Sequence, residues 1–185
     1  ESSQARPARL LPAALELAIS IGCAARDLCV EHDRHFALAL VSLADTIEAQ
    51  LHLGAAGSDG LATRAELLRH ALEHLPGPTT RLGVMKRYVT AVDHAVRAGQ
   101  QRPVELLAAL RRLTDFMRLL PVEEVRGTEL MYLHGLLAVK CIVLGYLNDE
   151  GSLQTAEQGC IGFASERPGM KSFALQFSYL LTVGG

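Results

Sequence analysis

Residues 128–147, TELMYLHGLLAVKCIVLGYL, are the stretch that decides the fold. A helix drawn through them is apolar on nearly all sides, which is typical of a helix in a protein interior. The sequence therefore predicts a central helix over Thr128–Leu147 and predicts that it is the most buried element. His134, Lys140 and two glycines interrupt the apolar run, so it falls short of a membrane-spanning segment.

Five further helices are predicted upstream, because apolar residues recur there at spacings of three and four. Pro12 fits only a first turn and places the first start near it. Thr63 and Glu66 have the spacing of a capping box. The predicted buried stripe of the first helix is Leu11, Leu15, Ala18, Ile21, Ala25 and Leu28. That of the third helix is Ala65, Leu68, Leu72 and Leu75, and that of the fifth is Leu106, Leu110, Leu113, Met117 and Leu120. The predicted ranges are Leu10–Val30, His35–Leu53, Arg64–Leu75, Thr80–Ala98 and Pro103–Leu120.

The C-terminal end changes period. Residues 173–183, FALQFSYLLTV, alternate between large apolar and small or polar side chains with one exception, Leu180. A period of two is the signature of a half-buried strand, and Pro168-Gly169 before it predicts a hairpin turn. A final helix is the alternative, because Phe173, Phe177 and Leu180 also fit helical spacing.

Together these patterns predict a mainly α protein, either an antiparallel helical bundle or a short α-solenoid of about six helices, with a C-terminal β-hairpin or strand. We expect a helical domain over residues 1–150. Residues 151–185 would form an appendage that packs on the helices or on a partner. The succession of helices and short turns resembles solenoid repeats, but the diagnostic repeat residues are missing.

Composition narrows the class of protein. The net charge is −2, which argues against a basic nucleic-acid-binding face. Four widely spaced cysteines without a CxxC pair predict reduced thiols and a cytoplasmic or nuclear location. Residues 6–25 superficially resemble a secretory signal, but Glu16 interrupts the apolar run, so we expect no signal peptide and no membrane span.

Clusters of metal-binding residue types occur twice. Cys29, His32 and His35 step by three, and His70 and His74 lie four apart on a predicted helix. Neither cluster has a further pair at a zinc-site spacing, and HALEH lacks the order of a HExxH motif. We therefore predict no metal, no cofactor and no catalytic residue.

The sequence favours a non-enzymatic helical module, an adaptor, scaffold or regulatory unit that binds a protein partner or a second copy of itself. The predicted contact residues are Phe173, Phe177, Tyr179 and Leu181, whose apolar faces need cover. Three alternatives remain: a ligand-binding regulatory bundle with an apolar pocket near His134, an all-α enzyme, and a domain excised from a larger protein or polyprotein. The last is suggested by a start at Glu1 and an end at Gly184-Gly185.

Overall fold

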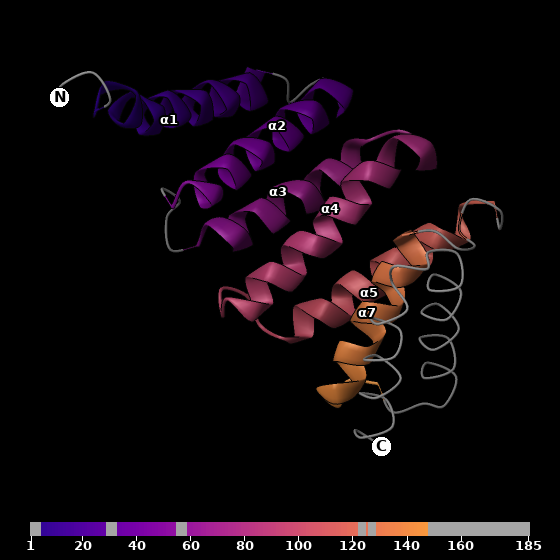
Figure 1. Cartoon of the computed structure of the whole chain (residues 1–185). Coiled ribbons are helices and arrows are strands. Elements are labelled where there is room, and N and C mark those ends of the chain that lie inside the picture. Colours follow the sequence, from indigo (N-terminus) through magenta and orange to yellow (C-terminus); the bar gives the residue numbers. More distant parts are fainter. Residues whose placement is uncertain (1–4, 29–32, 55–58, 122–124, 126–128, 148–185) are drawn as a thin grey trace. The chain divides into compact units, whose positions relative to one another are not determined.

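The computed structural model describes residues 5–28, 33–54, 59–121, 125 and 129–147. Six long helices make up most of this part, which contains no strand (Figure 1). The helices are α1 (Ala5–Leu28), α2 (Asp33–His52), α3 (Gly60–His74), α4 (Pro78–Arg97), α5 (Val104–Arg118) and α7 (Glu129–Val143). The mainly α prediction is therefore confirmed for these residues.

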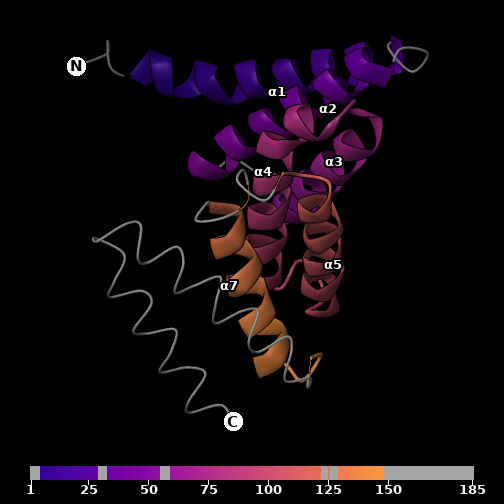
Figure 2. The same cartoon turned by 90° about the vertical axis from the view of Figure 1, so that its right-hand side faces the viewer.

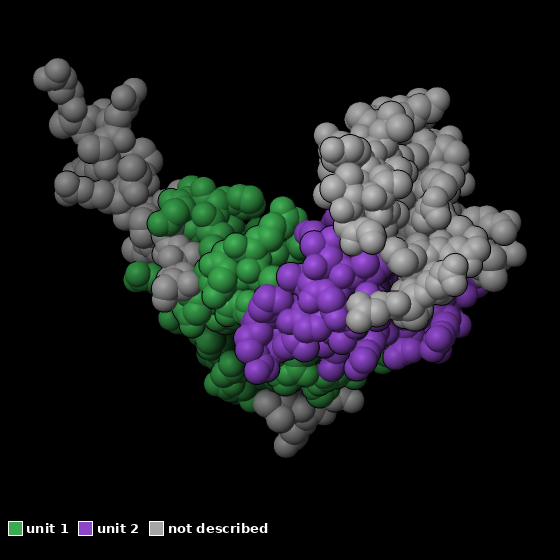
Figure 3. Space-filling model, turned by 90° about the horizontal axis from the view of Figure 1, so that it is seen from below, with its two compact units in different colours: residues 1–101 green, residues 102–185 purple. Residues whose placement is uncertain are grey.

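The chain divides into two compact units, residues 1–101 and 102–185 (Figure 3). In the first unit α1 packs on α2, α2 on α3 and α3 on α4. Each helix runs back along the one before it (Figures 1 and 2). Consecutive antiparallel neighbours joined by short connections are the expected outcome of helical segments of similar length.

The core of the first unit follows the apolar periodicity. The stripe predicted for the third helix is confirmed, since Ala65, Leu68, Leu72 and Leu75 are all buried. The buried stripe of α2 is Leu40, Leu43 and Ile47, and that of α4 includes Met85, Val89 and Val92. These side chains meet because residues three and four apart share one face of a helix.

The N-terminus of α3 departs from the prediction. Thr63 lies inside the helix, which begins at Gly60 after Asp59, so the predicted capping box is wrong. Its role is taken by Gln100, whose Oε1 accepts hydrogen bonds from the backbone N–H groups of Leu61 (2.9 Å) and Ala62 (3.1 Å). A residue nearly forty positions away thus satisfies two of the N–H groups that every helix start leaves open.

The other end of α3 is also tied down from α4. The Arg81 guanidinium donates from Nε to the carbonyl oxygen of Leu75 at 2.6 Å. The connection contains Gly77 at φ +64°, a conformation that glycine adopts without strain, and Pro78 opens α4 at a first helical position. Helix α3 is therefore fixed at both ends by residues that follow it in the chain.

The second unit contains α5 and α7, which pack on each other. Leu106, Leu110 and Leu113 of the stripe predicted for α5 are buried, whereas Met117 is half-buried and Phe116, outside the predicted stripe, is buried instead. A larger share of α7 is buried than of α3, α4 or α5, and Leu137 is 0% exposed. The prediction that Thr128–Leu147 is the most buried element is therefore confirmed only for Glu129–Val143. The predicted C-terminal end is wrong, because the helix ends at Val143, and Val143, Leu144 and Tyr146 are exposed.

Three further predictions concern membrane spans, the C-terminal hairpin and the domain boundary. None of the described helices is both long enough and apolar enough to cross a bilayer. The predicted hairpin over 159–183 lies outside the described residues, as does the predicted domain boundary near residue 150, and both stay predictions.

Candidate functional site

Helix α1 contacts α2 through a narrow face made of small and half-buried residues. Ile19, Gly22, Cys23 and Arg26 are all partly covered and lie on one side of the helix. A Cβ atom added at Gly22 would lie 2.5 Å from Cδ2 and 2.8 Å from Cγ of Leu43, a buried residue of α2. Glycine at this position is therefore what allows α1 to approach α2 so closely.

The opposite side of α1 is apolar and uncovered. Leu17 is 61% exposed, Ile21 59% and Leu28 84%, and Ala24 between them is exposed as well. We call these four residues the outer face of α1. Their spacing of four, three and four places them in one row, because each residue turns the helix by 100°. The centre of this row lies about 180° from the centre of the face formed by Ile19, Gly22, Cys23 and Arg26. Helix α1 thus has two apolar faces, and α2 covers one of them.

This arrangement corrects the stripe predicted for the first helix. Ile21 and Leu28 were expected in the core and are exposed, whereas Ile19 and Gly22, outside the predicted stripe, face α2. The start predicted near Pro12 is also wrong, since α1 begins at Ala5. Periodicity could not choose the covered face because α1 carries apolar and small residues on two sides, and a pattern of spacing does not say which side meets a neighbour.

The two edges of the outer face differ in charge. Ala18 and Ala25 border it on one side, and Ser20 and Asp27 on the other, with the exposed Glu16 one turn before Ser20. The carboxylate of Asp27 is held by Arg26 at 2.6 Å within the same helix. A second helix could therefore approach this row over the alanine edge without meeting a charged side chain.

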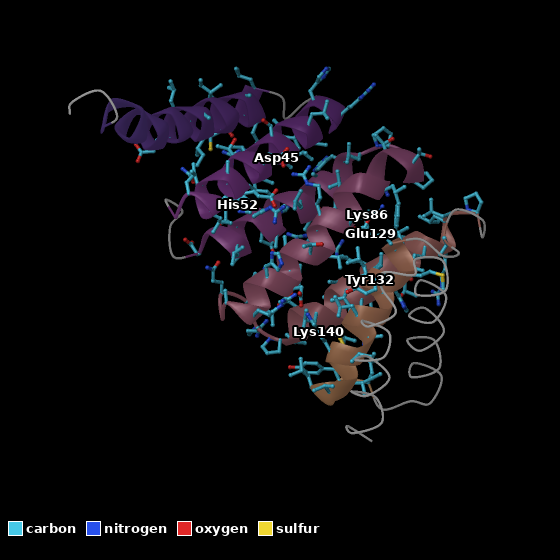
Figure 4. The ribbon with its side chains drawn as sticks, viewed as in Figure 1. Asp45, His52, Lys86, Glu129, Tyr132 and Lys140 are labelled. Carbon is cyan, nitrogen blue, oxygen red and sulfur yellow. The ribbon has the colours of Figure 1, made fainter. Side chains whose placement is uncertain are left out.

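The helices beneath α1 are linked by ion pairs that stiffen the unit. Glu48 of α2 pairs with Arg64 of α3 at 2.7 Å, and Arg64 is only 4% exposed. Asp45, in the middle of α2 (Figure 4), pairs with Arg87 of α4. Arg64 is buried, so removing Glu48 would leave a buried charge unpaired, whereas Asp45 is exposed and its pair with Arg87 adds little to stability.

The histidines singled out in the sequence do not form a metal site in the described residues. His70 is exposed beside Glu73 (Nδ1 to Oε2, 3.6 Å), whereas the ring of His74 packs edge-on against Phe36 of α2 at 4.9 Å between centroids. His35 is exposed on α2, and Cys29 and His32 lie outside the described residues. No three His, Cys, Asp or Glu side chains of the described part are grouped to hold a metal ion.

His134 and Lys140, the titratable residues of α7, have separate environments. Nε2 of His134 lies 3.0 Å from Oγ1 of Thr114 on α5, and Thr114 in turn donates to the carbonyl oxygen of Leu110 at 2.9 Å. Because the Thr114 hydroxyl donates to Leu110, its oxygen can accept a hydrogen bond from the Nε2–H of His134, and this bond joins the two helices. Burial lowers the pKa of His134 and raises that of the nearby thiol of Cys141 to about 11. Lys140 lies on the same helix, farther toward its C-terminal end (Figure 4).

The predicted contact residues Phe173, Phe177, Tyr179 and Leu181 lie outside the described residues, so their role stays a prediction. The outer face of α1 was missed, although the sequence carries a signal for it. The steps of four, three and four from Leu17 to Leu28 extend back to Leu10 and Ala14, the a/d spacing of a coiled coil. No family model, no curated protein and no solved structure matches this chain.

Proposed function

We propose that the protein is a non-enzymatic helical interaction module that binds another protein through the outer face of α1. The observation that carries the proposal is the exposure of Leu17, Ile21 and Leu28 in one row. Contiguous apolar surface of a few hundred Å² on a folded unit marks an interaction site, whereas scattered single residues do not. Of the other large apolar side chains that are exposed in the described part, Val143, Leu144 and Tyr146 lie together at the end of α7, and the rest lie singly.

The rest of the first unit suits this role. Its helices α2, α3 and α4 share a buried core and the ion pairs of Arg64 and Arg87, so they present α1 from a stable base. A preformed helix with an apolar row can enter a groove or pair with another helix without ordering a segment first, and this lowers the entropic cost of binding.

The test is a pull-down with the full chain as bait, read by mass spectrometry. Leu17→Asp places a charge in the outer face, and Leu38→Asp makes the same change at an exposed leucine (51%) on α2 as the matched control. We expect partners that the wild type and Leu38→Asp retain and that Leu17→Asp loses. Capture that is equal for all three baits would contradict the use of this face.

A further inference from the structure

We propose that α1 is a strap that opens from α2 while α2, α3 and α4 stay packed together. The inference rests on the proposed function, because it concerns how the helix that carries the outer face is held. Opening uncovers the covered face of α1, around Gly22, and the surface of α2 that contains Leu43. The contact between α1 and α2 is then autoinhibitory, since it hides both of these surfaces in the closed state.

The burial of α1 differs from that of its neighbours. No residue of α1 from Glu16 to Leu28 is fully buried. Each of the other three helices of the unit carries side chains with 1% exposure or less, such as Ala37 of α2, Leu68 of α3 and Val89 of α4. Local opening is easiest where few apolar contacts are fully buried, so α1 is the helix of this unit that opens at the lowest free energy.

Polar contacts connect the other helices to one another. The buried Arg64 of α3 pairs with Glu48 of α2, and Gln100, which follows α4, caps the N-terminus of α3. Arg26 of α1 pairs instead with Asp27 of its own helix. Separation of α1 from α2 therefore leaves the connections among α2, α3 and α4 in place.

The contact at Gly22 shows what opening exposes. A Cβ atom added there would lie 2.5 Å from Cδ2 of Leu43, so α1 covers the end of this leucine with bare backbone. Glycine brings no side chain into the contact, and the apolar area buried at this point is correspondingly small. When α1 leaves, Leu43, which is 3% exposed in the closed state, loses part of its cover.

The opened α1 is a weak helix. It has 24 residues, and Pro12 lies in its interior, where proline removes a backbone hydrogen bond. Most of the stability of such a helix comes from packing against a neighbour rather than from its own residues. Opening therefore frees the backbone N–H groups of α1, and their exchange with solvent makes the opening measurable.

Hydrogen exchange of the full chain, read residue by residue by NMR, tests the strap. The N–H groups of residues 16–28 should be at least about a hundredfold less protected than those of α3, because α1 opens without the rest of the unit. Equal protection of the two helices would overturn the proposal, since α1 would then be released only when the whole unit unfolds.

Leu68→Ala separates local opening from global unfolding. The closed and open states share the core around α3, so the protection of α3 should fall at least about thirtyfold, as expected for a fully buried leucine. The protection of residues 16–28 should change less than about threefold, because their opening leaves that core intact. Equal falls in α1 and α3 would overturn the proposal.

Gln100→Ala is a milder variant for the same comparison, in case Leu68→Ala does not fold. Loss of the cap should lower the protection of α3 by about threefold to thirtyfold and leave that of residues 16–28 unchanged. A fall of the same size in α1 would again overturn the proposal.

The proposed function and the strap fail in different ways. If no captured protein is lost by Leu17→Asp but α1 exchanges independently of α3, the strap stands and binding through the outer face is wrong. If α1 and α3 are equally protected but Leu17→Asp loses a partner, the interaction module stands and the strap is wrong.

Discussion

Helices α1 and α3 belong to the same unit but are covered very differently. Helix α3 lies between α2 and α4, its apolar stripe is buried, and both of its ends are capped by residues from other parts of the chain. Helix α1 makes extensive contacts only with α2. None of the α1 residues from Glu16 to Leu28 is fully buried. Both helices have apolar spacing, so spacing alone does not tell a core helix from one that offers a face to a partner.

The largest expected difference between the two helices is the cost of removing a leucine. Leu68 of α3 is 0% exposed, so Leu68→Ala should lower the free energy of unfolding by about 2–5 kcal/mol through lost burial and the cavity it leaves. Leu17→Ala on the outer face of α1 should change it by less than about 0.5 kcal/mol, as surface substitutions do. Urea denaturation measures both. Equal losses would mean that Leu17 is covered and that the comparison is false.

Gly22 tests how closely α1 packs against α2. Gly22→Ala forces a Cβ against Leu43, whereas Gly83→Ala on α4 is the matched control, because nothing lies within 4 Å of a Cβ added there. Both changes gain helix propensity, so the difference between the two variants reports the clash, which we expect to be about 1–3 kcal/mol in unfolding free energy. Indistinguishable variants would contradict the close approach of α1 to α2.

Gln100 tests how firmly α3 is held at its N-terminus. Gln100→Ala removes the acceptor for the N–H groups of Leu61 and Ala62 and should cost about 0.5–2 kcal/mol of stability, the range of a lost helix cap. Gln100→Glu keeps the oxygen acceptors and adds a negative charge at a helix N-terminus, so it should retain the stability at neutral pH. If both variants behave alike, the cap is not what Gln100 contributes.

The smallest effect is a dependence on pH in the second unit. Burial holds the pKa of His134 below its ordinary value of about 6.5, so below that pH the unfolded chain binds a proton that the folded chain does not. Stability should be full above about pH 6.5 and should fall as the pH is lowered. His134→Gln keeps a donor for Thr114 without titrating, and it should flatten this fall when unfolding is measured from pH 7.5 to 5. An unchanged slope would remove His134 as its source.

Much of the fold could be predicted from the sequence, because the signals for each helix lie within that helix or next to it. Apolar spacing lies within the helix that it describes, so the stripe of α3 was predicted correctly and that of α5 in most of its residues. The cap from Gln100 could not be predicted, because it joins residues almost forty positions apart. The covered face of α1 depended on a contact with α2 that no pattern within α1 encodes, and so the candidate site was missed.

The most direct test of the central claim is hydroxyl-radical footprinting of the full chain in dilute solution, read residue by residue. We expect Leu17, Ile21 and Leu28 to be labelled as rapidly as Leu38, whereas Leu68 should be protected. Protection of Leu17, Ile21 and Leu28 to the level of Leu68 would show that the chain itself covers the outer face of α1, and it would contradict this claim.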